Sequence, residues 1–319
     1  MSYHIISIDE EGCRLSVSRG QLCMQTGASR RSVPLEDVAS IVISAYRCEL
    51  SLHFLTRVAL EGIGLVLCEQ GKPAALLLPA SRATDTALLR HLGRMPPQLS
   101  RRLWSKTVTA KCANQAAVAE QWNPAGTDIA AMRQLAFGDK DFREAETARL
   151  YWRNFAATVS APDFRRGRSA GGFNALLNYA YAVLLSFVSG RLFAVGLDPC
   201  FGIHHCARAR SAPLAYDLME PFRPLFDAQV MRWIEQMRAE GKSDAEAAEI
   251  STAYRRHILS TLLLRVDYRQ GSHELRHVIE LVLRSFRAAV LAGQSSPYEP
   301  WILSTIKWDG SSSCLISRR

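Results

Sequence analysis

Histidines and carboxylates gather in one short stretch of the chain. His204 and His205 follow a segment containing Gly and Pro, and Asp217 and Glu220 come about a dozen residues later. Carboxylate oxygens with an occasional imidazole are ligands that Mg²⁺ and Mn²⁺ accept, and such an ion can hold a phosphodiester and activate an attacking oxygen. The stretch indicates one wall of a divalent-metal site, for which Glu144 is the best candidate on the opposite wall.

Each of these signals also has an ordinary structural explanation. Asp217 and Glu220 have the spacing of a capping box ahead of a helix, with Pro221 acceptable in its first turn. Glu144 in the first turn of a predicted helix is favoured by the helix dipole alone. One histidine of an adjacent pair is commonly buried and hydrogen-bonded. Spacing by itself favours the cap and leaves the metal site open.

The predicted secondary structure that must position these residues changes from strands to helices along the chain. Short apolar or alternating segments predict strands at 4–8, 14–18, 21–25, 40–44 and 64–68, with a hairpin turn at Arg19-Gly20 and a helix at 50–60. Helical periods follow, at 96–121, 129–137, 142–155, 173–195, 221–240, 244–264 and 274–292. The apolar helix at 173–195 contains Asn174, Asn178 and Arg191, which favours a buried core helix over a membrane span.

This pattern predicts an α+β fold with a small N-terminal β-rich domain and a larger all-α catalytic domain. We place the first domain at residues 1–80, as a scaffold or dimer interface, and the second at 81–292. Residues 293–319 are rich in Ser and Pro and basic at their end, which predicts a flexible tail.

Charge and cysteine content narrow the class of protein. The chain of 319 residues carries 39 basic and 30 acidic residues, and 33 of the basic ones are Arg. Residues 1–80 have a net charge of −1 and residues 81–319 a net charge of +10, so a polyanion should meet the second part. Arginine suits phosphate recognition, although GC-rich coding gives the same bias. Eight scattered cysteines and no evident signal peptide predict a reduced, cytoplasmic protein.

Four motifs in series carry a resemblance to a known family. They are Phe142-Arg143-Glu144-Ala145 with Tyr151-Trp152, the segment from Phe173 to Leu184, Gly202-Ile203-His204-His205, and Asp217-Leu218-Met219-Glu220-Pro221-Phe222-Arg223-Pro224. In this order, together with the layout of a sheet followed by helices, they resemble the CRISPR-associated adaptation integrase, the endonuclease and integrase of spacer acquisition in antiviral defence. The version found beside type II systems is the most similar.

The resemblance implies a role for each candidate residue. It gives the metal ligands as Glu144, His205 rather than His204, and Glu220, with Asp217 as an auxiliary acid and Mg²⁺ or Mn²⁺ as the ion. Phe142 stands where the family usually has Asn, which leaves Glu146 as an alternative to Glu144, although the distance to Tyr151 favours Glu144.

The resemblance also implies the reaction and the partners. A 3′-hydroxyl of a short duplex attacks a phosphodiester at the boundary of a repeat, and water in its place gives nuclease activity. The implied partners are double-stranded DNA, a second copy of the chain, a small ferredoxin-like adaptation subunit and possibly the effector nuclease of the same locus, with no membrane. Arginines near the motifs are candidates for phosphate contacts: Arg143, Arg149, Arg153, Arg165, Arg166, Arg168, Arg208, Arg210 and Arg223.

Two other functions fit the residues. A metal-dependent phosphoesterase of small substrates would use the same ligands without needing a strongly basic catalytic part. A non-catalytic, arginine-rich DNA-binding scaffold would explain the arginines and treat the acids as helix caps. It predicts that Glu220→Ala costs helix stability and leaves any DNA processing unaltered.

Overall fold

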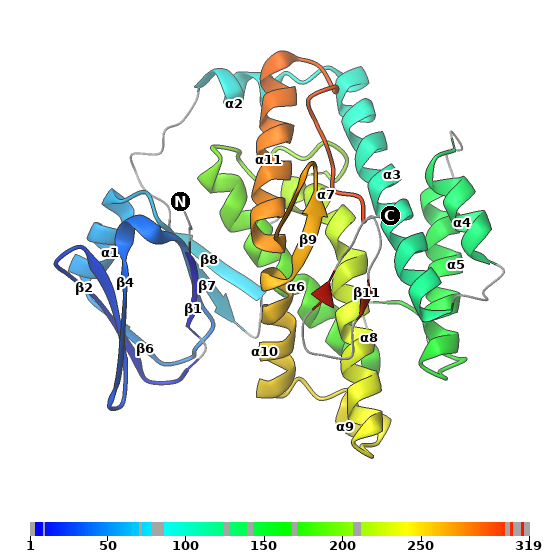
Figure 1. The fold of residues 1–319 in the computed structure, drawn as a ribbon. Coiled ribbons are helices and arrows are strands. Elements are labelled where there is room, and N and C mark those ends of the chain that lie inside the picture. Colours follow the sequence, from blue (N-terminus) through cyan, green and yellow to red (C-terminus); the bar gives the residue numbers. More distant parts are fainter. Residues whose placement is uncertain are drawn as a thin grey trace.

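A β-rich N-terminal part lies beside a larger helical part in the computed structural model (Figure 1). The structure describes residues 4–8, 10–69, 72–77, 86–123, 128–138, 143–167, 171–206, 212–303, 307–308 and 314–315. The predicted order of a β-rich region followed by helices is confirmed. The predicted domain boundary after residue 80 falls outside the described residues.

The N-terminal part contains two four-stranded sheets. One has the order β1-β5-β7-β8, from β1 (His4–Ile8), β5 (Val38–Ile43), β7 (Gly64–Glu69) and β8 (Lys72–Leu77). Its strands β1, β5 and β7 are parallel and β8 is antiparallel to β7. The two continuous apolar runs of the sequence thus form the central strands β5 and β7, as is typical of strands in a mainly parallel sheet.

The second sheet has the order β4-β3-β2-β6. Its strands are β2 (Cys13–Ser18), β3 (Gln21–Thr26), β4 (Ser29–Pro34) and β6 (Cys48–Leu50). Arg19 and Gly20 form the predicted turn between β2 and β3, both with positive φ, 50° and 73°. The helix α1 (Leu52–Leu60) begins at Ser51, whose side chain accepts from the backbone N–H of Phe54. The strands β4, β6 and β8 had no clear signal in the sequence, because β4 is polar and mostly exposed and β6 is short.

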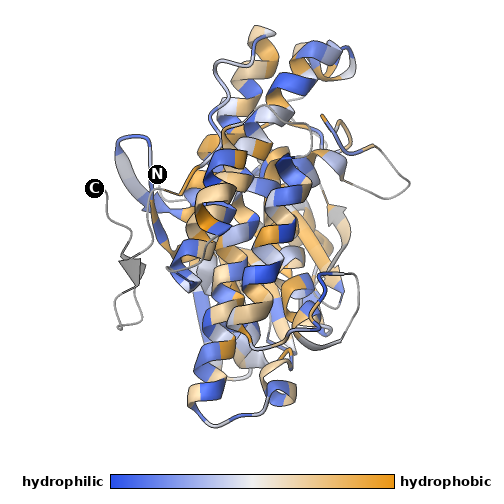
Figure 2. Ribbon diagram, turned by 90° about the vertical axis from the view of Figure 1, so that its right-hand side faces the viewer, coloured by the Kyte–Doolittle hydropathy of each residue, from blue (hydrophilic) through white to orange (hydrophobic). Residues whose placement is uncertain are grey.

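Helices dominate the rest of the chain. They are α2 (Thr86–Gly93), α3 (Pro97–Trp122), α4 (Asp128–Ala136), α5 (Arg143–Thr158), α6 (Gly172–Ala194), α7 (Pro213–Met219), α8 (Arg223–Ala239), α9 (Asp244–Ala247), α10 (Thr252–Ser260) and α11 (Leu275–Ala292). Figure 1 shows α3, α4 and α5 side by side, on the far side of the helical part from the sheets. Hydrophilic and hydrophobic residues alternate along the helices in Figure 2, as expected for helices with one face in a core.

Helix α6 runs through the middle of the molecule and packs against β7 and β8 as well as α7 and α8. Among the described residues it is the one helix long and apolar enough to cross a membrane by length and composition, and 56% of the relevant window is buried in the fold. Its residues Leu176, Leu177, Ala180, Leu184 and Val188 are fully buried in the main hydrophobic core. It therefore has the packing predicted for a core helix.

Three sequence predictions were wrong in detail. The helix expected at 221–240 is preceded by the helix α7 and a 3-10 turn at Glu220–Phe222, so α8 starts at Arg223. The helix expected at 244–264 is broken into α9 and α10, each with its own serine cap. The helical part is not entirely α, because β9 (Arg265–Tyr268) and β10 (Gly271–Glu274) form a hairpin ahead of α11, and the short strands β11 (Lys307–Trp308) and β12 (Cys314–Leu315) also pair.

The expected flexible tail was wrong for its first part. Residues 293–303 pack on the helical core, where Tyr298, Trp301 and Leu303 are 0%, 1% and 5% exposed. Lys106 of α3 donates to the carbonyl oxygens of Ser295 and Tyr298 at 2.8 and 2.7 Å. We call residues 293–303 the C-terminal strap. The Ser and Pro content that suggested disorder belongs to a segment held by large aromatic side chains.

Candidate metal centre

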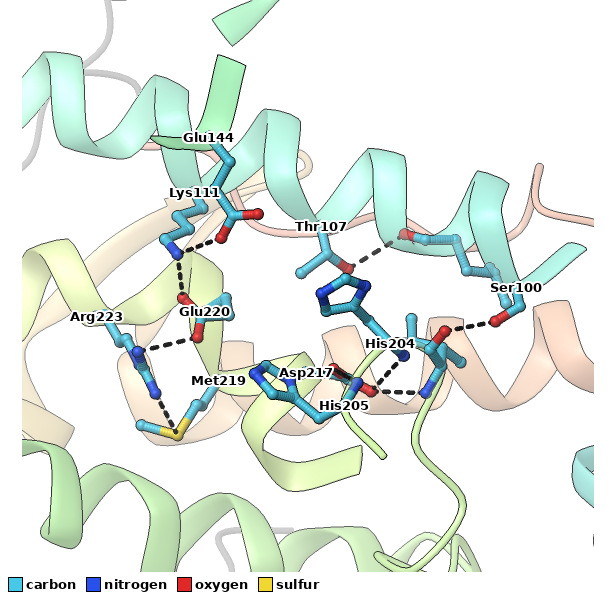
Figure 3. Close-up of polar contacts among 12 residues, drawn as sticks. Ser100, Thr107, Lys111, Glu144, His204, His205, Asp217, Met219, Glu220 and Arg223 are labelled. Atoms are coloured by element: carbon cyan, nitrogen blue, oxygen red, sulfur yellow. Dashed lines mark hydrogen bonds and ion pairs between the residues drawn. The ribbon is translucent and has the colours of Figure 1, made fainter. Parts of the chain in front are cut away.

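Two carboxylates from different elements meet beside α3. Glu144 lies in the first turn of α5, and Glu220 begins the 3-10 turn between α7 and α8. Lys111, near the middle of α3, reaches both: its Nζ is 2.7 Å from Oε1 of Glu144 and 2.7 Å from Oε2 of Glu220. Figure 3 shows this ammonium group between the two acids. The structure thus brings together Glu144 and Glu220, which are far apart in the sequence.

Glu220 is buried and surrounded by positive charge. Its side chain is 3% exposed, and its Oε1 lies 3.0 Å from Nη1 of Arg223. Burial alone would raise the pKa of Glu220, but the Arg223 and Lys111 cations outweigh it and hold the pKa below its usual value. Oε2 is buried and has the ion pair with Lys111 but no aligned hydrogen bond. A buried carboxylate oxygen in this state is suited to a cation that can approach it directly.

His205 is fixed by Asp217. Nδ1 of His205 lies 2.6 Å from Oδ1 of Asp217, and Asp217 is fully buried. The carboxylate also accepts from the backbone N–H groups of Ile203, His204 and His205 at 2.6, 3.1 and 3.1 Å. Because Asp217 accepts from Nδ1, the lone pair of the neutral ring is on Nε2. The hydrogen bond to Asp217 raises the pKa of His205, more than partial burial lowers it.

The loop that carries the histidines is pressed closely against α3 and α7. A Cβ on Gly202 would come within 2.4 Å of the carbonyl oxygen of His205 and 2.7 Å of Pro213, so only glycine fits at this position. Ser100 of α3 donates to the carbonyl oxygen of Ile203 at 2.6 Å. Trp104, one turn further along α3, stacks on the ring of His204 with centroids 4.1 Å apart. In Figure 3 the ring of His205 points toward the end of the site that holds Glu220 and Arg223.

The capping explanation for Asp217 and Glu220 was wrong. Helix α7 begins at Pro213, so Asp217 lies within it and cannot be its N-cap, and α8 has no side-chain cap. Both oxygens of Asp217 already accept hydrogen bonds from the histidine loop. Its role in the structure is to orient His205 rather than to face the space between Glu144 and Glu220. Asp217 is therefore placed by its hydrogen bonds to the histidine loop and not by a helix cap, which the spacing in the sequence could not show.

The C-terminal strap supports the turn that carries Glu220. Asn114 of α3, fully buried, donates to the carbonyl oxygens of Pro221 and Trp301 at 2.6 and 3.1 Å. Its own oxygen accepts from the backbone N–H of Leu303 at 2.7 Å. The ring of Trp301 stacks on Phe222 with centroids 5.6 Å apart and an interplanar angle of 7°. The carboxamide of Asn114 and the indole of Trp301 therefore join α3, the Glu220 turn and the strap.

A family model described as CRISPR associated protein Cas1 matches residues 6–262. The chain belongs to the Cas1 family. A relative from Neisseria meningitidis serogroup C (strain 8013), named CRISPR-associated endonuclease Cas1, is 32% identical over 289 residues, which cover 88% of this chain and 90% of the relative. The resemblance drawn from the four motifs is thereby confirmed at the level of the family.

Solved structures share the fold of this Cas1-family chain. A casposase bound to integration product has a TM-score of 0.69 at 21% identity, covering 94% of each chain. A chain in a Cas6-RT-Cas1–Cas2 complex has a TM-score of 0.71 at 16% identity, covering 94% of this chain and 36% of that longer one. At such identities the likeness concerns the fold alone.

The donor set of this Cas1-family chain fits a divalent cation. Glu144 and Glu220 meet through Lys111, the ring of His205 points toward Glu220, and Oε2 of Glu220 is a buried acceptor without an aligned donor. In the described part of the chain no three His, Cys, Asp or Glu side chains already close around one point. Figure 3 shows the Lys111 ammonium between the two acids.

A cavity of about 250 Å³ opens beside the acids. Its lining includes Lys111, Arg166, Tyr181, Arg223 and Asp227. Asp227 accepts from the hydroxyls of Tyr181 and Tyr151 at 2.7 and 3.0 Å. Burial raises the pKa of Asp227 to about 6, more than these hydrogen bonds lower it. The guanidinium groups of Arg166 and Arg223 both lie over the ring of Tyr181, at 5.2 and 4.8 Å from its centroid.

The candidate arginines have unequal surroundings. Arg143 donates to the carbonyl oxygens of Gly138 and Ser105, which ties α5 to α3 and α4. Arg149 pairs with Glu146 and Arg153 with Asp128, and both guanidinium groups remain more than half exposed. Glu146 therefore points away from Glu220, which favours Glu144 as the acid of the site. Arg168, Arg208 and Arg210 lie outside the described residues.

Two arginines close to the cavity differ from each other. Arg165 is exposed and bonds to the nearby carbonyl oxygens of Pro162 and Phe164. Arg166 is half-buried and donates to the side-chain oxygens of Asn174 and Asn178. Arg165 keeps a guanidinium group on the surface, whereas Arg166 helps to build the wall of the cavity.

Sequence reasoning missed Lys111 and Asn114. Lys111 is one of only six lysines in the chain and stands among small residues, Ala110, Cys112 and Ala113. A lone lysine in such a stretch of a predicted helix signals a buried cation that needs acid partners. Asn114, three residues on, is a buried amide that needs carbonyl partners. The sequence contained these signals, but not the identity of the partners.

Proposed function

We propose that this chain is a metal-dependent DNA endonuclease and integrase of CRISPR adaptation, which joins 3′-hydroxyl ends of short duplex DNA into a repeat array. The observation that carries the proposal is the pairing of Glu144 and Glu220 through Lys111 beside α3, with an Asp217-oriented His205 pointing toward Glu220. The membership of the Cas1 family supports it, as does the name of the Neisseria relative, an endonuclease.

The reaction is a transesterification. The 3′-oxygen of the incoming duplex forms a bond to phosphorus in the repeat strand, the bond from that phosphorus to the 3′-oxygen of the target strand breaks, and the attacking hydroxyl loses its proton while the leaving oxygen gains one. Water as the attacking group gives strand cleavage instead. Mg²⁺ or Mn²⁺, held by Glu144, His205 and Glu220, would supply positive charge for the phosphate and lower the pKa of the attacking oxygen.

The protein's own groups prepare the site for this reaction. Asp217 keeps the proton on Nδ1 of His205 and so presents Nε2 as a donor atom. Arg223, over Tyr181 and against Glu220, adds a fixed positive charge beside the acids. Burial of Glu220 keeps bulk water from competing for its oxygens.

The surface of the chain and its structural relatives support the proposed partners. The helical part, with a net charge of +10 from residues 81–319, would bind the backbone of double-stranded DNA through exposed arginines such as Arg165, Arg149 and Arg153. Tyr46, Leu52 and Leu60 are 88%, 79% and 64% exposed on the N-terminal part, which supports homodimerisation through that part. A small ferredoxin-like adaptation subunit, of the kind named Cas2 in the complex above, and the effector nuclease of the same locus are further partners, in the cytoplasm.

The test is strand transfer of a labelled short duplex with free 3′-hydroxyl ends into a supercoiled plasmid carrying a repeat, in Mg²⁺ or Mn²⁺, with and without the partner subunit. Glu144→Ala, His205→Ala and Glu220→Ala should bind DNA and give no joined or nicked product. Glu146→Ala is the matched control for Glu144, because Glu146 lies on the same helix and pairs with Arg149 away from the site. A wild type that binds DNA tightly but never joins or cuts it would leave the scaffold function in place of the integrase.

A further inference from the structure

Lys111 is the positive group that the acids of the site share. Its Nζ lies 2.7 Å from an oxygen of Glu144 and 2.7 Å from an oxygen of Glu220, and its side chain is 14% exposed. A lysine ammonium at ion-pair distance from two carboxylates is a cation. The two carboxylates are thus held together by an ammonium group that comes from the protein itself.

The charges around this point already balance. Glu144 and Glu220 carry two negative charges, and Lys111 and Arg223 carry two positive charges within ion-pair distance of them. Asp217 is engaged with three backbone N–H groups and His205 on the other side. A divalent cation that binds here adds two positive charges to a cluster that is already neutral. It also has to take the position between Glu144 and Glu220 that the Lys111 ammonium occupies.

We propose that Lys111 is a resident counter-cation of the acidic ligands, which a divalent metal ion must displace, and that the ion therefore binds weakly until DNA phosphates supply negative charge. The inference rests on the proposed function, because it takes Glu144 and Glu220 as metal ligands. Its consequence is a coupling of metal and DNA binding: each raises the affinity of the other by the same factor.

The structure gives the displaced ammonium a place to go. Lys111 lines the cavity of about 250 Å³ beside the acids. Asp227 lies in the same wall and is a buried carboxyl group whose present donors are two tyrosine hydroxyls. The long, unbranched lysine side chain can turn from the carboxylates into this cavity without moving α3.

A second lysine on the same helix provides a comparison within the molecule. Lys106 donates to backbone carbonyl oxygens of Ser295, Ser296 and Tyr298 in the C-terminal strap. Among the described residues Lys106 has no ion pair with an acidic side chain, and its contacts are those of a structural clamp. Lys106→Met is therefore a matched control: it removes a lysine from α3 and leaves the charge balance of the site unchanged.

The experiment measures Mn²⁺ binding to the purified chain by electron paramagnetic resonance of the free ion, with and without a short duplex that has free 3′-hydroxyl ends. Wild type should bind Mn²⁺ weakly alone, and the duplex should tighten binding by about tenfold or more. Lys111→Met should bind Mn²⁺ about tenfold more tightly than wild type without DNA, and the gain from DNA should shrink. Lys106→Met should behave as wild type in both titrations.

Further variants distinguish failure of the Lys111 proposal from failure of the proposed metal site. Lys111→Gln replaces Lys111→Met if the latter unfolds, as judged by thermal denaturation. If Lys111→Met or Lys111→Gln has the affinity and the DNA gain of wild type, or binds Mn²⁺ more weakly, the counter-cation role is overturned while the metal site stands. If wild type binds no Mn²⁺ with or without DNA, or Glu220→Ala binds it as well as wild type, the proposed metal site fails, and the role of Lys111 fails with it.

Discussion

The candidate metal centre has two halves that are held in different ways. In the acidic half, Glu144 and Glu220 are held by the side-chain cations of Lys111 and Arg223. In the histidine half, His205 is held by Asp217, which is itself fixed by three backbone N–H groups. Ion pairs between flexible side chains can be exchanged for another cation, whereas a loop fixed through its backbone is set when the chain folds. For the proposed metal ion, the histidine half is therefore prepared in advance, and the acidic half is the part that must rearrange.

The largest effect should come from breaking the acidic half at Glu220. Glu220→Gln removes the charge of a proposed metal ligand, and strand transfer should fall by about a thousandfold, or about 4 kcal/mol. The unfolding free energy should also fall by about 3 kcal/mol, because Lys111 and Arg223 lose their buried partner. Strand-transfer rates and urea denaturation measure the two effects.

Glu280→Gln is the control for that experiment. Glu280 is also a buried glutamate, 8% exposed, and pairs with Arg284 and Arg191 outside the site. Glu280→Gln should lower the unfolding free energy and leave the rate of strand transfer unchanged. Equal losses of activity in the two variants would mean that Glu220 acts only through stability.

Trp301 tests whether the acidic half depends on the C-terminal strap. Trp301→Ala removes the stack on Phe222, next to Glu220, and the indole bond to the carbonyl oxygen of Asp267. Loss of a buried tryptophan should cost about 4 kcal/mol of unfolding free energy, measured by urea denaturation. Ile302→Ala, at an exposed neighbouring position, should cost under about 0.5 kcal/mol. If both variants unfold like wild type, the strap does not support the site.

Asp227 tests the electrostatic surroundings of the acidic half through pH. Burial raises the pKa of Asp227 from 3.8 to about 6. At a pH between these two values the folded protein keeps the proton and the unfolded chain has lost it. The resulting stability is fully present below about pH 4 and is lost as pH rises through about 6, to a total of about 3 kcal/mol. Asp227→Asn has no such proton, so the difference in stability between wild type and variant should change over this interval and be constant above about pH 7. A difference that is constant from pH 4 to 8 contradicts the raised pKa.

The smallest of these effects should come from the histidine half. Asp217→Asn cannot accept from all its present donors, and strand transfer should fall by about 30-fold, or about 2 kcal/mol, as for other carboxylates behind a metal-binding histidine. The pKa of His205, measured by NMR titration, should fall relative to wild type because the Asp217 carboxylate is what raises it. Asp198→Asn is the control, because Asp198 accepts from the backbone N–H of its near neighbour Cys200. An unchanged His205 titration in Asp217→Asn would mean that the carboxylate does not orient the ring.

Local patterns in the sequence predicted most of the elements that build the site. The 3.6-residue periods predicted α3, α5, α6 and α11 to within a few residues, and the apolar runs predicted the central strands β5 and β7. These features depend on neighbours a few residues apart, so a single sequence contains them. The motifs likewise led to Glu144, His205 and Glu220, because the family pattern keeps these residues at characteristic positions in the sequence.

Only the tertiary structure decided what surrounds these residues. Lys111 meets Glu144 across 33 positions of sequence, and Asn114 meets Trp301 across 187. Asp217 orients His205 instead of capping a helix, and Arg149 and Arg153 meet acids from their own or a neighbouring helix. A charge pattern shows that a buried lysine or carboxylate needs a partner, but the packing of α3 against α5, the Glu220 turn and the strap selects which partner it has. The candidate ligands were therefore predicted from the sequence, whereas the cation that holds them was decided by the fold.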